Sequence, residues 1–312
     1  MTHTSFKAAR IASAIAMSLV AACQAQAAST YAATRYPFVL AHGTTGFDHI
    51  GPVDYFYGIT KDLQANGAKV YTTQVSAWHS SDVRGEQFLI QFKKILAVSG
   101  AAKVNLLGHS QGAQTVRYAA GIMPDRVASV TTVNGVNFGS PVGDLAASAS
   151  KLGGPAATAM VTSLVNALGK LIDTLAGDPS LPQDTEAWIG SVSNAGADAF
   201  NARFPAGLPA TRCGQGPAKA NGISFYSWGS NKVSTNLLDP LDLMTSLTSL
   251  AFLGKPNDGL VGQCDSHLGT VIRDNYPMNH FDAVNQAIGL RGSFDPVPLY
   301  RQHANRLKLQ GL

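Results

Sequence analysis

The pentapeptide Gly108-His109-Ser110-Gln111-Gly112 is the feature that most limits how this chain can fold. It lies between a short apolar run at residues 104–107 and a helical pattern at residues 111–123. A serine in a G-x-S-x-G pattern marks a sharp turn from a strand into a helix, where the glycines allow the two elements to approach closely. The pattern therefore predicts a strand–turn–helix unit with the Ser110 hydroxyl presented at the turn.

Short apolar runs alternate with helical patterns along most of the chain. This order predicts an α/β fold with a mostly parallel central sheet covered by helices on both faces. With no internal repeat or linker, we expect a single domain over residues 28–312. The predicted strands are residues 36–41, 69–75, 104–107, 127–133 and 223–228, and the predicted helices are residues 57–66, 85–98, 111–123, 243–253 and 300–307.

The pattern changes at residues 138–177, which are rich in Ala, Gly and Ser. Apolar residues recur there at helical spacing, directly after a predicted core strand. We interpret this segment as an inserted helical cap or lid, and a fixed core helix is the alternative. Residues 179–222 have an irregular and partly helical pattern.

The N-terminus has the three parts of a secretory signal peptide. Lys7 and Arg10 precede an apolar run at residues 11–22, and Ala25-Gln26-Ala27 offers a cleavage site. We therefore expect residues 1–27 to be removed and the protein to be secreted. The alternative is a lipid-anchored protein, because Val20-Ala21-Ala22-Cys23 resembles the box at which bacterial lipoproteins are cut and lipidated.

Cysteine usage and charge agree with export and exclude some partners. Cys213 and Cys264 remain after the leader and form an even pair, which in an oxidising compartment predicts a disulfide, with two free thiols as the alternative. Apolar residues make up 45% of the chain and charged residues 13%, and this composition argues against a disordered chain. A net charge of +4 without a dense Lys/Arg stripe argues against nucleic acid as a partner.

A serine nucleophile needs a base and an orienting carboxylate, which follow it in the chain order Ser, Asp or Glu, His in folds of this kind. We favour His280, because it lies in a loop-like stretch before a short helix, and Asp258, because it lies in a turn before an apolar pair. His267 and His303 remain alternatives for the base, and Asp239, Asp242, Asp265 and Asp274 remain alternatives for the acid.

An oxyanion hole needs two backbone N–H donors. The residue after the nucleophile, Gln111, supplies one. The loop after the first strand supplies the other, and we assign it to Thr44. A simple strand-ending turn at His42-Gly43 is the alternative interpretation of that loop.

From residue 31 to residue 307 the sequence resembles the Pseudomonas–Burkholderia family of secreted triacylglycerol lipases. The resemblance depends on long stretches spread over the chain. They are Tyr31-Ala32-Ala33-Thr34-Arg35-Tyr36-Pro37, Arg84-Gly85-Glu86-Gln87, Lys103-Val104-Asn105-Leu106, the Ser110 pentapeptide, Asn257-Asp258-Gly259-Leu260-Val261, Val271-Ile272-Arg273-Asp274-Asn275-Tyr276 and His303-Ala304-Asn305-Arg306-Leu307-Lys308.

The resemblance implies an α/β-hydrolase fold with a helical lid near residues 143–170 and a Cys213–Cys264 bridge. It also implies one structural Ca²⁺ near His280. Carboxylate and backbone carbonyl oxygens, the ligands that the resemblance implies, suit that ion. A dedicated folding chaperone in the cell envelope is implied as a partner, and we expect a monomer. The implied catalytic triad is Ser110, Asp258 and His280, and the implied calcium ligands are the carboxylates of Asp239 and Asp282 and the carbonyls of Gln286 and Leu290. From the residues alone, a solvated surface pair is the favoured interpretation of Asp239 and Asp282, and the resemblance reverses that preference.

Three departures from the family leave substrate preference and lid behaviour open. Thr44 stands where the family usually has Leu or Met, which makes the acyl-pocket wall more polar. Ala113 replaces a frequent Gly after the pentapeptide, and residues 134–140 replace a stretch that normally carries Pro, His and a basic residue.

Together these observations predict ester hydrolysis through an acyl-enzyme. The apolar cap favours a lipase acting on water-insoluble acylglycerols. An esterase or polyesterase acting on short-chain or aliphatic polymer esters is the nearest alternative, and a peptidase or thioesterase fits less well. A non-catalytic secreted binding protein on the same fold is the alternative from another class, but the chain retains all three residue types of a triad.

Overall fold

The structure, a computed structural model, describes residues 29–152 and 154–312. The predicted signal peptide and Cys23 lie outside the described residues. Within the described part of the chain, no helix is both long enough and apolar enough to span a membrane.

A mostly parallel sheet forms the centre of the molecule and confirms the predicted fold class. Its strand order is β4-β1-β5-β6-β8, and β8 also pairs with β7 and with β9. Only β7 runs antiparallel to its neighbour. The strands are β1 Phe38–Ala41, β4 Val70–Thr73, β5 Val104–His109, β6 Val127–Val133, β7 Lys219–Ala220, β8 Ile223–Ser230 and β9 Thr270–Tyr276.

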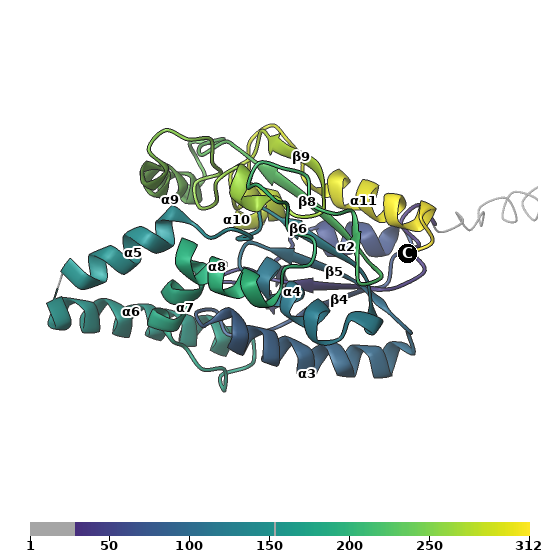
Figure 1. The fold of residues 1–312 in the computed structure, drawn as a ribbon, viewed down its shortest axis with the longest axis horizontal. Coiled ribbons are helices and arrows are strands. Elements are labelled where there is room, and N and C mark those ends of the chain that lie inside the picture. The colour runs from purple at the N-terminus through teal and green to yellow at the C-terminus, as the bar shows by residue number, and fades with distance from the viewer. Residues whose placement is uncertain (1–28, 153) are drawn as a thin grey trace, which may run out of the picture.

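Helices cover both faces of this sheet, which is why its central strands are apolar runs without polar alternation. Helices α3, α4 and α8 pack on one face through residues such as Phe88 and Phe200. Helices α2 and α11 pack on the other face through Leu63 and Leu307 (Figure 1). The bounds are α2 Ile59–Ala65, α3 Ser81–Ser99, α4 Gly112–Ile122, α8 Asn194–Arg203 and α11 Val297–Leu309.

The segment predicted as a cap is helical. Helix α5 (Pro141–Leu152) and helix α6 (Gly154–Leu175) follow β6 and extend away from the sheet, at the left of Figure 1. Helix α7 (Thr185–Val192) then leads back to α8. Whether α5 and α6 move as a lid stays a prediction.

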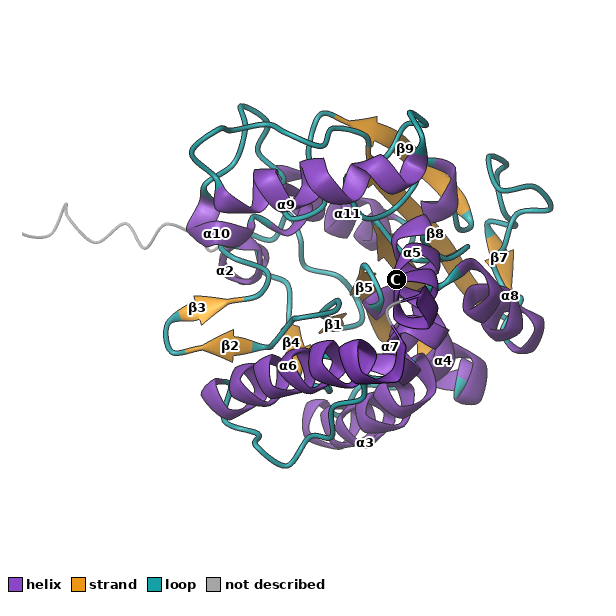
Figure 2. Cartoon of the chain, turned by 90° about the vertical axis from the view of Figure 1, so that its left-hand side faces the viewer, coloured by secondary structure: helices purple, strands orange, loops and turns teal. Residues whose placement is uncertain are grey.

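The rest of the chain adds short elements around the end of the sheet from which α5 and α6 extend. The hairpin of β2 and β3 and the helices α9 and α10 lie there, as Figure 2 shows. These elements are β2 His49–Ile50, β3 Val53–Asp54, α9 Pro240–Thr248 and α10 Gln286–Gly289, with 3-10 turns at Pro124–Arg126, Ser249–Phe252, Cys264–Ser266 and Asp282–Val284.

A Cys213–Cys264 disulfide is present, and it confirms the bond predicted from the even cysteine pair. The two cysteines are separated by 51 positions. Closing a loop of that length removes about 4 kcal/mol of denatured-state entropy in the simple chain model. The bond joins the segment after α8 to the segment just before β9.

The topology brings the predicted site residues to one edge of the sheet. Ser110 follows β5, Thr44 lies in the loop after β1, and His280 follows β9. Ligands of open α/β sheets bind outside the carboxyl ends of the strands, because the loops there converge. Residues far apart in sequence therefore meet beneath the inserted helices.

Candidate active site

Ser110 sits at the turn between β5 and α4 in a left-handed backbone conformation, with φ of 56°. Such a conformation is strained for a residue with a side chain. Two hydrogen bonds hold it: the Ser110 N–H donates to the carbonyl of Val133 (3.1 Å), and the Val136 N–H donates to the carbonyl of Ser110 (3.1 Å). The turn thus lifts the serine side chain away from the sheet toward solvent-facing loops.

Glycines permit this turn because neighbouring backbone lies too close for a Cβ atom. A Cβ on Gly108 would overlap the carbonyl of Gly112, and a Cβ on Gly112 would overlap the carbonyl of Ala41. A Cβ on Gly43 would lie 2.6 Å from the Cβ of Ser110. The G-x-S-x-G pattern is therefore a packing requirement here.

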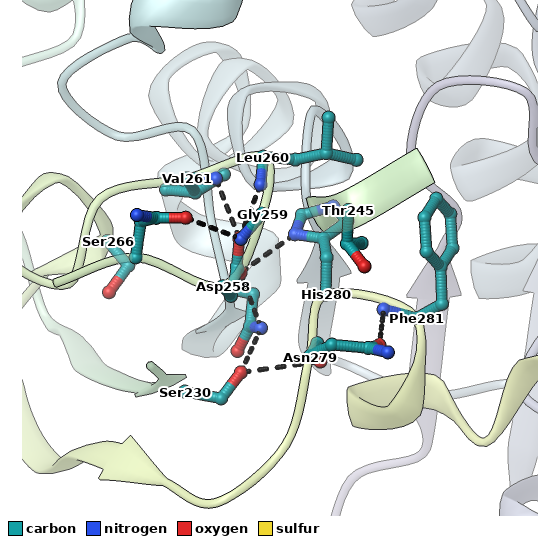
Figure 3. A network of polar contacts seen from close by, with 12 residues as sticks. Ser230, Thr245, Asp258, Gly259, Leu260, Val261, Ser266, Asn279, His280 and Phe281 are labelled. Carbon is teal, nitrogen blue, oxygen red and sulfur yellow. Dashed lines mark hydrogen bonds and ion pairs between the residues drawn. The ribbon is translucent and has the colours of Figure 1, made fainter. Parts of the chain in front are cut away.

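Asp258 and His280, the acid and base that the sequence analysis favours, form a buried pair. Asp258 Oδ2 lies 2.8 Å from His280 Nδ1, and the His280 N–H donates to the Asp258 carbonyl at 2.9 Å (Figure 3). Both side chains are about 2% exposed. Because Nδ1 is engaged by the carboxylate, Nε2 is the ring nitrogen left for the serine or the substrate.

The Asp258 carboxylate is surrounded by hydrogen-bond donors. Oδ1 accepts from the N–H groups of Leu260 (2.9 Å) and Val261 (2.7 Å), which lie in the same turn (Figure 3). Oδ2 accepts from the Asn134 amide (2.7 Å) as well as from His280. An ionised carboxylate only accepts hydrogen bonds, so this set of donors suits its charged form.

Ser110 and His280 line one cavity of about 220 Å³ at the carboxyl edge of the sheet. Asp258 lies behind His280 and does not reach the cavity wall. Most of the wall is apolar, which suits a hydrocarbon chain better than a charged ligand. Its other residues include Thr44, Trp78, Val136, Val142, Trp188, Val192, Met244, Leu260 and Val261.

The two predicted oxyanion donors flank Ser110. Gln111 is its chain neighbour, and Thr44 lines the cavity beside it. Within residues 29–152 and 154–312, neither backbone N–H donates a hydrogen bond to a protein group. Two uncommitted N–H groups beside the serine are what an oxyanion hole requires.

Arg84 fixes the loop that carries Thr44, a role that the sequence analysis did not assign. It is fully buried and donates to the carbonyls of His42 (2.7 Å) and Gly43 (3.1 Å). Desolvation lowers its pKa to about 10, which still leaves it charged at neutral pH. Its only sequence signal was its place in a stretch that resembles the lipase family.

His109 and Tyr55 form a second network that the sequence analysis missed. The Gly43 N–H donates to Tyr55 Oη (3.2 Å), and Tyr55 Oη lies 2.8 Å from His109 Nδ1. His109 Nε2 lies 3.1 Å from the carbonyl of His280. Burial lowers the pKa of His109 well below its ordinary value, so the neutral ring accepts at Nδ1 and donates at Nε2. This network joins the Thr44 loop to the backbone of His280.

The alternative bases and acids are engaged elsewhere. His267 pairs with Asp274 (3.0 Å) and the Gly214 carbonyl, and His303 is buried against Thr131 (2.8 Å). Asp265 pairs with an arginine, and Asp242 accepts hydrogen bonds from Ser234, Thr235, Asn236 and Asn279.

The two carboxylates predicted to bind calcium are buried, with Asp239 3% and Asp282 2% exposed. This burial contradicts the alternative of a solvated surface pair. Desolvation raises the pKa of each carboxyl above its ordinary value. Asp282 Oδ1 is buried without a hydrogen-bond partner, and such an atom needs a proton or a cation.

The predicted carbonyl ligands belong to a strained loop. Asn285, Ala287 and Ile288 all have left-handed φ values, between 53° and 58°. The described residues contain no cluster of three His, Cys, Asp or Glu side chains suited to a metal. A calcium site here would therefore combine two carboxylates with the carbonyls of Gln286 and Leu290, which is a chemically suitable set.

The fold and the buried serine–histidine–aspartate arrangement define an α/β hydrolase. Residues 36–155 match a family model described as alpha/beta hydrolase fold. The chain belongs to the bacterial triacylglycerol lipase family, as two relatives show. It is 48% identical over 284 residues to "Triacylglycerol lipase" of Vibrio cholerae serotype O1, covering 90% of each chain. It is 38% identical to "Triacylglycerol lipase" of Burkholderia plantarii, covering 97% of this chain and 94% of the relative.

A third relative agrees with this assignment, and one solved structure is similar in fold. "Triacylglycerol lipase" of Pseudomonas fragi is 43% identical, covering 89% of this chain and 98% of the relative. These relatives confirm the resemblance found in the sequence motifs. The crystal structure of Staphylococcus hyicus lipase is similar in fold, with a TM-score of 0.59 and 17% identity, covering 89% of this chain and 98% of that one.

Proposed function

We propose that the protein hydrolyses carboxylic esters of acylglycerols, with Ser110 as nucleophile, His280 as general base and Asp258 as the group that orients the base. The observation that carries this proposal is the shared cavity. Ser110 and His280 line one mostly apolar cavity, and His280 is backed at Nδ1 by a buried carboxylate. Relatives named triacylglycerol lipase support the substrate class.

The reaction proceeds in two halves. His280 Nε2 takes the Ser110 proton while Oγ attacks the ester carbonyl, and the N–H groups of Thr44 and Gln111 stabilise the oxyanion. His280 then gives that proton to the leaving alcohol as the carbonyl–oxygen bond breaks. Water repeats the sequence on the acyl-enzyme, releasing the carboxylic acid and restoring the serine.

Exposed leucines near the cavity support a water-insoluble substrate. Helix α9 contributes Met244 to the cavity wall, and on the same segment Leu243, Leu247 and Leu250 are each more than 60% exposed. Their spacing puts them on one side of the segment. Contiguous exposed apolar surface of this kind favours contact with a lipid phase.

The test compares hydrolysis of a long-chain triacylglycerol emulsion with that of a soluble short-chain ester. We expect faster turnover on the emulsion and a loss of about 10⁴-fold or more in kcat on both substrates for Ser110→Ala. The matched control is Ser129→Ala, because Ser129 is also buried but donates its hydroxyl hydrogen bond to Asn105 within the sheet. An unchanged rate in Ser110→Ala would contradict the assigned nucleophile.

The same comparison tests an esterase or polyesterase on this fold. The Thr44 hydroxyl makes one part of the cavity wall polar, which favours shorter or more polar acyl groups. Activity that depends on Ser110 but is confined to soluble or polymeric esters would favour this second function.

We propose that one structural Ca²⁺ binds Asp239, Asp282 and the carbonyls of Gln286 and Leu290. The ion would hold the loop after His280, because Asp282 is two residues from the base, and it supplies charge compensation there. The unpartnered Oδ1 of Asp282 supports this proposal.

Calcium removal should therefore lower thermal stability. We expect a chelator to lower the Tm by about 5 °C, and added Ca²⁺ to restore it. Asp282→Ala should have a low Tm that the chelator no longer changes. An identical Tm for the unmodified protein with and without chelator would count against the site. Export, the monomeric state and the folding chaperone stay predictions.

A further inference from the structure

A chain of three side chains links helix α7 to both residues of the proposed oxyanion hole. The Trp188 indole N–H donates to Thr44 Oγ1 at 2.9 Å. Thr44 Oγ1 in turn donates to Gln111 Oε1 at 3.1 Å. An indole N–H can only donate and an amide oxygen can only accept, so the direction of both hydrogen bonds is fixed.

The Gln111 end of this chain is immobilised. Its side chain is fully buried, and its Nε2 donates to the carbonyl of His79 (2.9 Å) and to Ser81 Oγ (3.2 Å). With the amide nitrogen engaged there, the amide oxygen faces Thr44. The Thr44 hydroxyl therefore meets a fixed acceptor.

The Trp188 end is also fixed, and it is tied to the inserted helices. The first turn of α7 is capped by Asp184, while the N–H and hydroxyl of Thr185 donate to Asn166 of α6 at 2.9 and 2.7 Å. The indole of Trp188 packs edge to face against Trp78, with ring centroids 4.6 Å apart. The donor to Thr44 thus has a defined place relative to α6.

The backbone around Thr44 gives a reason for such a link. Gly43 precedes Thr44, and Thr45 follows it with a φ of 57°. Arg84 holds the carbonyls of His42 and Gly43, but no hydrogen bond from the loop fixes the Thr44 N–H itself. Further donors to the Gly43 carbonyl, His42 Nδ1 (2.8 Å) and the Gly46 N–H (3.2 Å), help to orient the planar peptide that carries this N–H. The Thr44 side chain adds a direct link from this loop to Gln111, the residue that carries the second donor.

We propose that Thr44 is a positioning residue, whose hydroxyl links Trp188 to Gln111 and so aligns the two oxyanion donors. This link rests on the proposed function, because it serves the oxyanion hole of that reaction. It acts on the transition state more than on bound substrate, since the oxyanion exists only after attack. Its loss should therefore lower kcat and change KM little.

The test is steady-state kinetics on a soluble short-chain ester with Thr44→Val, Thr44→Ser and Trp188→Phe. We expect Thr44→Val and Trp188→Phe each to lower kcat about tenfold, with KM within about twofold. Thr44→Ser keeps the hydroxyl and should retain most of the kcat. The double variant should be no slower than Thr44→Val alone, because both changes break the same chain.

Two matched controls separate this role from general packing. Thr60→Val removes a buried hydroxyl in α2. Trp228→Phe removes an indole N–H that is buried without a hydrogen-bond partner in the core. Both should keep the kcat of the unmodified protein, with Tm measured for every variant.

The outcomes are distinguishable. Three results would overturn the link and leave the proposed function standing. They are a kcat of Thr44→Val equal to that of the unmodified protein, an equal loss of kcat in Thr44→Ser and Thr44→Val, and a change in KM without a change in kcat. Absence of any Ser110-dependent turnover in the unmodified protein would overturn both.

Discussion

At the scale of single residues, the strained Ser110 depends on glycines that allow strand β5, helix α4 and the Thr44 loop to meet. The pentapeptide pattern was sufficient to predict the roles of Gly108 and Gly112, because these roles are local and have a fixed spacing, but it did not predict that of Gly43. The structure adds the reason: the space that a Cβ would need at each of these glycines is already occupied by a neighbouring backbone carbonyl or by the Cβ of Ser110.

Gly108→Ala should therefore disrupt the turn. The new Cβ overlaps the carbonyl of Gly112, which is backbone and cannot rotate away. We expect a loss of about 2 kcal/mol or more in the free energy of unfolding, with a lower kcat in whatever folds. The control is Gly190→Ala in α7, where a Cβ meets open space. Equal Tm values for the two variants, measured by calorimetry, would contradict this reading of the turn.

The sequence predicted the other site residues only in part. The order Ser110, Asp258, His280 follows a known chain order, but sequence alone left several other acids and bases open. Arg84, His109 and Tyr55 carry no spacing signal, because their contacts come from separate strands and loops. A single buried Arg or His acquires its role only through three-dimensional packing.

At the scale of secondary-structure elements, helix α6 is attached to the body of the molecule through Asp173. This side chain is fully buried and accepts hydrogen bonds from the amides of Gln74 (3.0 Å) and Gln183. Desolvation, opposed by the Ala77 N–H, the Arg84 charge and the Gln74 amide, raises its pKa to about 7, and the nearby Asp178 adds to the increase. The attachment of α6 therefore depends on pH.

The sign of this dependence follows from the raised pKa. Folded Asp173 holds its proton up to a pH of about 7, whereas the unfolded side chain loses it near its model value of 3.8. Its contribution to stability is therefore complete below about pH 4 and is lost as the pH rises to about 7. Asp173→Asn, which cannot titrate, should reduce the fall in Tm between pH 5 and pH 8 by about 3 °C. The same fall in both proteins would contradict the role of Asp173.

Periodicity predicted the buried elements well and the exposed ones poorly. Strand β6 has the predicted bounds, because it is buried along its whole length. Helix α3 begins at Ser81, earlier than the apolar pattern at residues 85–98, because Ser80 caps it. Strand β9 was not predicted, since it lies at the edge of the sheet and includes Arg273, Asp274 and Asn275.

At the scale of the whole molecule, the sheet order brings together residues that lie far apart in the chain. Ser110 follows β5, and His280 follows β9, with β6 and β8 between these strands. The fold class was predictable because alternating strands and helices admit few arrangements. The residues of the cavity wall were not predictable, because the wall combines α5, α7, α9 and loops, and no local sequence pattern indicates how these segments are placed relative to one another.

The most direct test of the central claim is covalent trapping with a p-nitrophenyl alkylphosphonate, followed by peptide mass spectrometry. A serine activated by His280 and beside an oxyanion hole should displace p-nitrophenolate and keep the phosphonyl group. We predict one phosphonyl group per chain, on the peptide that contains Ser110, and none in Ser110→Ala. Ester hydrolysis that continues without this adduct, or an adduct on another residue, would contradict the assignment of Ser110 as the nucleophile.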